Sequence, residues 1–278
     1  MGLSVSDNID VALLRAYRAD DLSVLSHHFH NAYELIFIAE GEAEFVIDNK
    51  RRSYSSGEII FLSHLEQHQM KPLSKKYIRY IAIIDPDYFD RFVGDQALRS
   101  IFKNRPVNFE NGIKLSAKDA EKVLELMCEC AEECTNKAFC SDLAVMSKLL
   151  SLLILLYRGY TQYFPAVPSD LYTANATLIQ NYLDQNYLED FTLDDLAAHF
   201  HMNKFHLLEL FSEVTGYTIK RYTMLKRISH AKNLLYYTNS DVSQIASDSG
   251  FNSTSNFIRA FKRHEQITPL QFRKLGAY

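Results

Sequence analysis

The sequence predicts a two-domain protein, with an amino-terminal β-barrel domain that has flanking helices and an all-α carboxy-terminal domain. A chain of 278 residues is longer than the ~100–200 residues typical of one domain. Short runs rich in Ile, Phe, Val and Tyr lie between Tyr33 and Ile84, and apolar residues recur with a period of three to four after Ser116, which indicates strands first and helices afterwards. We therefore expect a first domain at 1–162, a proline-containing linker at 163–171 and a second domain at 172–278.

The composition is that of an ordinary globular protein. Hydrophobic residues make up 47% of the chain and charged residues 23%, with a net charge of −4, which excludes a disordered or fibrous protein. The four cysteines lie between Cys128 and Cys140, too few and too clustered for a disulfide-built secreted scaffold. The amino terminus lacks a signal-peptide pattern, and the longest apolar run, Leu149–Tyr157, is far shorter than the ~20 residues that span a bilayer. We expect a cytoplasmic protein without a membrane partner.

Strands are predicted where Ile, Phe, Val and Tyr gather between turn residues. The four expected strands are Tyr33–Ala39, Glu42–Asp48, Glu58–Leu62 and Tyr77–Ile84. Turns are expected at Glu40-Gly41, Asp48-Asn49 and Ser56-Gly57. Short antiparallel strands at this spacing are typical of a small barrel or a sandwich.

Two amphipathic helices are predicted after the strands. One begins after Ser116 and extends to Cys134, and a second runs from Ser141, the expected N-cap, to Tyr157. The second helix is apolar nearly all round and must therefore be buried. One of its faces can pack on the barrel, and we expect the other to form a homodimer interface over 117–159. The alternative is that both faces pack within one subunit.

Two stretches of the second domain repeat at a spacing near 49 residues, and each has the pattern of a helix-turn-helix unit. The units span about 192–213 and about 241–263, and a long helix over Lys220–Tyr237 joins them. Two helices held by one rigid body can enter successive segments of the major groove ~34 Å apart. The arrangement predicts DNA binding by one subunit at two positions.

Capping and turn residues recur in the two units. Thr192 and Asp241 are expected to cap the first helix of each unit with their side chains. Gly250 suits a turn with positive φ, whereas His201 occupies the matching position of the first unit less comfortably.

Charge is divided unevenly along the second domain. Residues 170–219 contain one basic and eight acidic residues, whereas 220–278 contain ten basic and three acidic residues. Because basic side chains neutralise phosphates, we expect the second unit to provide most of the affinity for DNA and the first unit to be the weaker or more discriminating one.

The region from Leu178 to Leu275 resembles the DNA-binding domain of the AraC/XylS family of bacterial transcriptional regulators. The resemblance rests on Leu-Asp-Asp-Leu-Ala-Ala at 193–198, Leu-Phe-x-x-x-x-Gly at 210–216, Lys-Arg-Ile-x-x-Ala-Lys-x-Leu-Leu at 226–235, Ile-Ala-x-x-x-Gly-Phe at 245–251, Phe-x-Arg-x-Phe-Lys-Arg at 257–263 and Thr-Pro-x-x-Phe-Arg at 268–273. These motifs cover about a third of the chain and are far more specific than a general helix-turn-helix pattern.

The resemblance implies which side chains contact DNA. In the second unit, base contacts are expected from Thr254, Ser255, Asn256 and Arg259, and phosphate contacts from Lys232, Lys262 and Arg263. Arg pairs with guanine and Asn with adenine, each discriminating by ~1–3 kcal/mol. In the first unit, the outward positions are Lys204, Phe205, His206, Leu208 and Glu209. Many family members have Arg or Gln where this chain has Leu208 and Glu209.

The segment around His28 resembles the first motif of the cupin barrel, with the spacing His28-x-His30-x3-Glu34-x6-Gly41. The second motif is partial, because Gly57 and His68 fit it but Ser63, Leu65 and Pro72 depart from it. The resemblance favours a cupin-like barrel and implies a metal or ligand site made of His28, His30, Glu34 and His68. Three histidines and one carboxylate suit Zn, Fe(II), Mn or Ni. Without a metal, the same side chains would line a polar cavity and bind a small molecule such as a sugar.

These observations together predict a ligand-responsive transcription factor that is not an enzyme. Its expected partners are an operator in double-stranded DNA, a small-molecule effector and a second copy of the chain, with RNA polymerase added if the protein activates transcription. The alternative is a metal-dependent cupin enzyme, or a metal sensor, fused to a DNA-binding domain. No cofactor is certain, and a divalent metal in the barrel is the one candidate.

Overall fold

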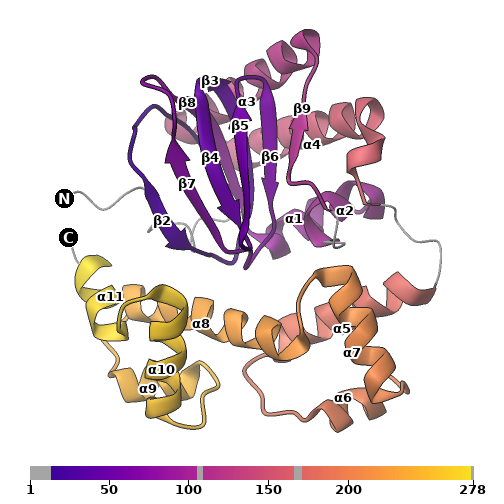
Figure 1. The fold of residues 1–278 in the computed structure, drawn as a ribbon, viewed down its shortest axis with the longest axis vertical. Coiled ribbons are helices and arrows are strands. Elements are labelled where there is room, and N and C mark those ends of the chain that lie inside the picture. The colour runs from indigo at the N-terminus through magenta and orange to yellow at the C-terminus, as the bar shows by residue number, and fades with distance from the viewer. Residues whose placement is uncertain (1–13, 105–108, 166–170, 277–278) are drawn as a thin grey trace. The chain divides into compact units, whose positions relative to one another are not determined.

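The computed structural model describes residues 14–104, 109–165 and 171–276. The chain divides into two compact units, an amino-terminal unit rich in sheet and a carboxy-terminal unit made of helices (Figure 1). Among the described residues, no helix is long and apolar enough to cross a membrane. Part of the predicted linker, 166–170, lies outside the described residues.

The amino-terminal unit contains two antiparallel sheets. The five-stranded sheet has the order β1-β8-β3-β6-β9, and the four-stranded sheet has the order β2-β7-β4-β5. The strands are β1 (Leu14–Ala19), β2 (Leu25–His28), β3 (Tyr33–Glu40), β4 (Glu42–Ile47), β5 (Lys50–Ser55), β6 (Glu58–Leu62), β7 (His68–Pro72), β8 (Ile78–Ile84) and β9 (Gly112–Lys114). The four strands predicted from the sequence correspond to β3, β4, β6 and β8, and the other five were missed.

The central strand β3 separates two hydrophobic cores. Leu35 and Phe37 point to the side covered by helices, while Ile36 and Ile38 point to the four-stranded sheet. This alternation follows from the period of two in a strand. All side chains from Tyr33 to Ile38 are buried, so β3 has no wet face.

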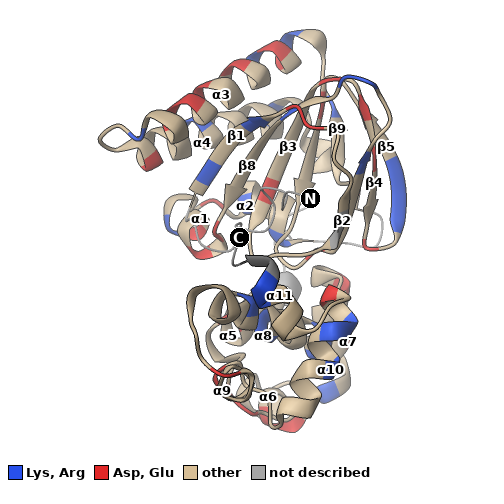
Figure 2. Cartoon of the chain, turned by 90° about the vertical axis from the view of Figure 1, so that its left-hand side faces the viewer, with Lys and Arg blue, Asp and Glu red and all other residues tan. Residues whose placement is uncertain are grey.

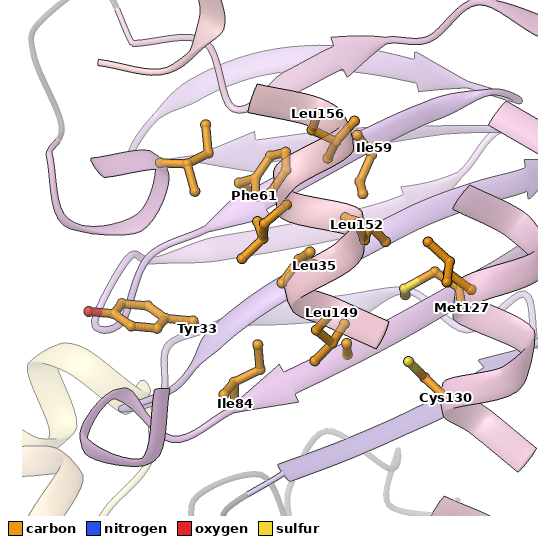
Figure 3. Close-up of a cluster of buried hydrophobic side chains, with 14 of the residues drawn as sticks. Tyr33, Leu35, Ile59, Phe61, Ile84, Met127, Cys130, Leu149, Leu152 and Leu156 are labelled. Atoms are coloured by element: carbon orange, nitrogen blue, oxygen red, sulfur yellow. The ribbon is translucent and has the colours of Figure 1, made fainter. Parts of the chain in front are cut away.

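Four helices cover the outer face of the five-stranded sheet. They are α1 (Pro86–Phe92), α2 (Gln96–Lys103), α3 (Ala117–Asn136) and α4 (Ser141–Gly159), and a short 3-10 helix, η2 (Thr161–Tyr163), follows. Leu149, Leu152 and Leu156 of α4 lie over the sheet side chains Leu35 and Phe61 (Figure 3). Two buried aromatic side chains of α1 and α2, Phe89 and Phe102, extend this core.

The prediction of a closed barrel is wrong. In the described residues, no strand pairing connects the five-stranded sheet with the four-stranded sheet. The side chains between the sheets form one continuous apolar cluster that includes Ile36, Phe45 and Met70. Packing two inner faces against each other buries this surface without closing the hydrogen-bond ladder, so the unit is a sandwich with helices on one side.

Helix α4 differs from the prediction at its start. Its N-cap is Cys140, in the left-handed region at φ 62°, and Ser141 is the first helical residue. The apolar residues on the flanks of α4, among them Leu150, Ile154 and Leu155, are half-buried against the same core. Packing within the subunit therefore covers much of the helix, and the homodimer stays a prediction.

The carboxy-terminal unit consists of seven helices in the described range. They are α5 (Leu171–Asn186), α6 (Leu193–His199), α7 (Lys204–Thr215), α8 (Ile219–Tyr237), α9 (Val242–Asp248), α10 (Thr254–Glu265) and α11 (Pro269–Gly276). The long helix α8 stands between the pair α6–α7 and the pair α9–α10 in sequence, as the periodicity predicts.

The caps of the two short helices are not equivalent. Thr192 caps α6 in a reciprocal capping box, since its hydroxyl accepts from the Asp195 N–H while the Asp195 carboxylate accepts from Thr192. Asp241 is the N-cap of α9, but its side chain makes no capping hydrogen bond to that helix. The predicted side-chain cap is confirmed for the first pair and wrong for the second.

The turn inside each helix pair has a residue with positive φ at the matching position, His201 at 52° and Gly250 at 74°. A Cβ atom on Gly250 would lie 2.7 Å from the Leu188 carbonyl oxygen and 2.9 Å from Nε of Arg227. Both contacts are closer than a Cβ atom tolerates, and the backbone conformation disfavours an L side chain as well. Both the close contacts and the positive φ therefore require glycine at position 250. At His201 we invoke only the unfavourable backbone conformation.

We predict opposite effects of two substitutions in these turns. Gly250→Ala should lower the free energy of unfolding of the helical unit by at least about 1–2 kcal/mol, because it adds both left-handed strain and a steric clash. His201→Gly should leave it unchanged or raise it, because glycine adopts positive φ without strain. Urea unfolding followed by circular dichroism measures both. Equal stability of Gly250→Ala and the wild-type protein would contradict the steric argument.

Candidate functional site

A polar cluster lies inside the sheet sandwich. Glu34 on β3 shares its face with Ile36, so the strand alternation places its carboxylate between the two sheets. His68 begins β7 and pairs in register with His28 at the end of β2. His30 follows β2, and its side chain is 3% exposed. The structure thus brings together all four residues that the sequence predicted.

The distances in the cluster are short. Nε2 of His30 lies 3.1 Å from Oε2 of Glu34, and Nε2 of His68 lies 3.5 Å from the same oxygen. The ring centroids of His28 and His68 are 4.2 Å apart. One ring nitrogen from each of the three histidines lies within 4.8 Å of the others. Small movements of the side chains would let these atoms converge on one centre.

The hydrogen bonds orient two of the histidine rings. Nδ1 of His68 lies 2.9 Å from the Glu66 carbonyl oxygen, so Nδ1–H donates to it, and Nε2 lies 3.5 Å from Oε2 of Glu34. Nε2–H of His30 donates to Glu34, and Nδ1 of His30 is buried without a hydrogen-bond partner among the described residues. A histidine whose second nitrogen donates to a carbonyl is typical of a metal ligand. The cluster offers ring nitrogens to a metal ion or to a hydrogen-bond donor of a ligand.

Glu34 is a buried carboxylate that stays charged. Burial raises the pKa of its carboxyl group, but the hydrogen bond from His30 and the charges of His68, His30 and Arg79 outweigh burial and lower the pKa overall. The interior of the sandwich therefore contains a negative charge at neutral pH. Such a charge favours a cation or the hydroxyl groups of a ligand.

Three residues of the same interior were missed by the sequence analysis. The Tyr77 hydroxyl is buried and has no hydrogen-bond partner among the described residues. The guanidinium of Arg79, 4% exposed, lies 5.1 Å from the Tyr77 ring centroid and 3.0 Å from a carboxylate oxygen of Asp21. Burial raises the pKa of Tyr17 and of Tyr77, and charges of Glu34 and Arg79 act on both. The alternating pattern of Leu14–Ala19 in β1 was the available signal for Tyr17.

A second candidate site is the exposed face of α10. Phe257 and Phe261 are fully buried, which turns Ser255, Asn256 and Arg259 outward. Nη2 of Arg259 donates to Oδ1 of Asn256 at 2.8 Å. Thr254 is half-buried at the start of the helix.

Basic side chains flank this face. Ser255, Ile258, Arg259, Lys262 and Arg263 line a shallow hollow of about 590 Å³ along α10. Figure 2 shows Lys and Arg on α10 and on α11. A helix with outward Arg and Asn and with nearby basic residues suits the major groove and its phosphates.

Helix α7 presents a less basic face. Phe205 is 79% exposed, and His206 and Glu209 are exposed as well. The Lys204 ammonium lies 2.9 Å from a carboxylate oxygen of Asp194, so its charge is partly neutralised. Leu208 is half-buried and lines a pocket against α8, which is a different environment from the other outward positions predicted for this helix.

Lys232 occupies an interior position, which argues against its predicted phosphate contact. It is 9% exposed, its Nζ lies 3.4 Å from Oε2 of Glu265, and the same ammonium lies 5.7 Å from the Phe272 ring centroid. Helix α8 turns this position towards α10 and α11. Lys262 and Arg263, by contrast, are exposed.

Comparison with protein families assigns both units. Residues 9–153 match the family described as an AraC-like ligand binding domain, and residues 196–275 match the family described as a helix-turn-helix domain. The first match covers the sandwich with α3 and most of α4, and the second covers α7 to α10 together with part of α6 and most of α11.

Two bacterial relatives have similar sequences. YfiF of Bacillus subtilis (strain 168), an uncharacterised HTH-type transcriptional regulator, is 27% identical over 257 residues, which are 89% of this chain and 78% of that protein. SAR0107 of Staphylococcus aureus (strain MRSA252), another uncharacterised HTH-type transcriptional regulator, is 23% identical over 256 residues, which are 92% of this chain. The chain spans 33% of the length of SAR0107.

Solved structures of ToxT from Vibrio cholerae share the fold. One of them has a TM-score of 0.61 at 19% identity and covers 94% of this chain and 97% of that chain. A structure of wild-type ToxT bound to an unsaturated fatty acid has a TM-score of 0.60 at 16% identity, with 95% of each chain covered. At this level of identity the likeness concerns the fold.

We predict that Lys232 contributes to the stability of the helical unit, whereas Lys262 contributes to DNA binding. Lys232→Met should lower the free energy of unfolding by about 3 kcal/mol, because it leaves the Glu265 carboxylate buried without its cation. Lys262→Met should change stability by less than about 0.5 kcal/mol and should weaken binding to DNA. Urea unfolding and fluorescence anisotropy with a labelled duplex measure the two effects. A stable Lys232→Met protein with weakened DNA binding would restore the phosphate role.

Proposed function

The chain belongs to the AraC family of transcriptional regulators, and on that premise we propose that it binds operator DNA under the control of a small molecule held in its sheet sandwich. The proposed domains are 1–162 for sensing and dimerisation, 163–171 as a linker and 172–278 for DNA binding. Within the last domain, the pairs α6–α7 and α9–α10 act as tandem helix-turn-helix units held apart by α8. The protein acts in the cytoplasm as a regulator and not as an enzyme.

The observation that supports DNA binding most directly is the outward face of α10. Arg259 and Asn256 are exposed, and the hydrogen bond between them holds both side chains on one face. Because this hydrogen bond already restricts the guanidinium, little further conformational freedom is lost when it pairs with a guanine edge. Ser255 and Thr254 complete the proposed base contacts of this unit.

The proposed phosphate contacts come from Lys262 and Arg263, which are exposed in the last turn of α10. In the first unit, Phe205, His206, Glu209 and Lys204 remain the proposed contacts, with an aromatic ring suited to a thymine methyl and a carboxylate suited to a cytosine amino group. Because Lys204 is partly neutralised by Asp194, the first unit adds discrimination more than affinity.

The proposed sensing site is the cluster of Glu34, His30, His68 and His28. A charged carboxylate that accepts a hydrogen bond from His30 and lies beside His68 suits a ligand rich in hydroxyl groups, such as a sugar. Ligand binding would shift a population between two arrangements of the DNA-binding domains in a dimer, provided that the ligand binds one arrangement more tightly. If the outcome is activation, RNA polymerase is a further partner.

A second candidate function is metal sensing or metal-dependent chemistry at the same cluster. The observation that favours it is the convergence of His28, His30 and His68 within 4.8 Å, with the Glu34 carboxylate beside them. The donor set fits a divalent metal, since it offers three imidazoles and a carboxylate, and a backbone carbonyl oxygen already accepts from Nδ1–H of His68. A bound metal would supply Lewis acidity at this point.

We predict that Arg259 determines sequence preference. A duplex selected from random sequence by the wild-type dimer should bind Arg259→Ala about 10–100-fold more weakly, with relaxed preference at one base pair. Lys262→Ala should weaken binding to all sequences alike and reduce the salt slope by about one. Anisotropy titrations at several salt concentrations separate the two patterns. Wild-type binding of Arg259→Ala to selected and random duplexes alike would remove the base-contact assignment.

We predict that a metal, if it is the physiological ligand, depends on His30. Protein purified without a metal-binding tag should hold about one equivalent of a divalent metal per chain, and His30→Ala should lose it. His206→Ala serves as the matched control, because it removes an exposed histidine of α7. Elemental analysis by mass spectrometry provides the measurement. Metal-free wild-type protein that also fails to take up Zn, Fe(II), Mn or Ni would leave only the organic ligand.

A further inference from the structure

A pocket of about 360 Å³ lies within the helical unit, separate from the sandwich. All of its lining residues belong to the segment before α6, to α6 and α7, and to the N-terminal half of α8 with the residue that caps it. They are Asp190, Phe191, Leu193, Leu208, Thr218, Ile219, Lys220, Thr223, Met224 and Arg227. The volume falls within the range of about 300–1,000 Å³ that is common for small-molecule sites.

The walls of the pocket are apolar. Phe191, Leu193, Leu208 and Met224 are half-buried, which leaves part of each side chain facing the pocket. Ile219 also lines the pocket and is 1% exposed. An apolar body placed here would remove these side chains from water, which is favourable in proportion to the area covered.

Thr223 supplies a polar group that has no partner. This residue lines the pocket, it is 8% exposed, and its hydroxyl has no hydrogen-bond partner among the described residues. A threonine inside a helix ordinarily gives its hydroxyl to a carbonyl oxygen one turn earlier. A buried hydroxyl without a partner is unfavourable, and a bound ligand with a hydrogen-bonding group would provide the partner.

The charge around the pocket is positive. The Arg227 guanidinium is fixed on the carbonyl oxygens of Tyr187 and Glu189, at 2.6 and 2.8 Å, which carry no charge. The carboxylate of Asp190 lies 3.8 Å away and is 71% exposed, so it compensates the guanidinium only weakly. In the described parts of the chain, the exposed Lys220 ammonium forms no ion pair.

The start of α8 adds to this positive charge. Thr218 is the N-cap, and Ile219 and Lys220 are the first two helical residues. Their N–H groups have no partner within the helix and form its positive end. An anionic group at this position would meet a helix terminus and the Lys220 side chain.

We propose that this pocket is a second ligand site of the protein and that it takes a small apolar molecule with one carboxylate. The apolar part lies between α7 and α8 against Leu208 and Met224, and the carboxylate faces Lys220 and the first turn of α8. Thr223 donates its hydroxyl to the ligand. The site is independent of the sandwich and does not require that the chain bind DNA. Since Leu208 follows Phe205 by one turn of α7, the ligand contacts this helix next to the exposed Phe205 side chain.

Methyl NMR on the full-length protein tests the site with 4-phenylbutyrate as the probe and 4-phenylbutan-1-ol as its uncharged counterpart. Because the probe has about a dozen heavy atoms, we expect a Kd of about 1 mM. The acid should shift the methyl signals of Leu193, Leu208, Ile219 and Met224 and should bind about fivefold more tightly than the alcohol. The methyl groups of Ile36 and Ile38 in the sandwich report binding at the proposed sensing site.

Two variants sharpen the test. Lys220→Gln should abolish the difference between acid and alcohol, and Thr223→Val should weaken both probes about threefold to tenfold. Lys274→Gln, at an exposed lysine of α11, serves as the charge-matched control and should change neither affinity. Shifts confined to Ile36 and Ile38 would overturn the pocket but support the sensing site. Equal affinity of acid and alcohol, or no saturable shift up to about 10 mM, would overturn the proposal as well.

Discussion

Helices cover one face of β3 and a second sheet covers the other, so its side chains from Tyr33 to Ile38 are removed from water. Every other residue of this strand must point into the sandwich, and position 34 is one of them. A carboxylate at that position is acceptable only where hydrogen bonds and positive charge compensate it. His30 and His68 provide this compensation and keep Glu34 ionised. The packing of one strand thereby creates the polar cluster that distinguishes this interior from an ordinary core.

The helical unit is arranged on the same principle, with buried anchors that orient exposed groups. Phe257 and Phe261 fix α10 from inside, and Asn256 and Arg259 are turned outward as a result. The basic residues of this unit are not all available to DNA, because Lys232 forms an interior ion pair with Glu265. Charge counted along the sequence therefore overstates the charge that is available to DNA.

Much of the site could be predicted from the sequence, because the spacing His28-x-His30-x3-Glu34 and the capping box at Thr192 are local patterns. The strands with a clear alternation or a dense apolar run, β3, β4, β6 and β8, were found for the same reason. Strands β5 and β9 were missed, since β5 is mostly exposed and β9 has three residues. Tyr77 and Arg79 were missed as well, because a polar residue in a strand is usually solvated and only the facing sheet makes it interior.

By itself, the sequence determined that a sheet-rich unit precedes a helical unit, that the chain belongs to the AraC family, and which residues are the candidates for binding metal, ligand or DNA. These properties depend on residue types at short spacing, which the chain displays directly. Only the tertiary structure decided that the sheets form a sandwich and not a closed barrel, that Lys232 is interior, and that Leu208 lines a pocket with α8. These outcomes depend on contacts between segments that are distant in sequence. No local sequence pattern specifies how such segments pack, and the packing decides which side chains are buried.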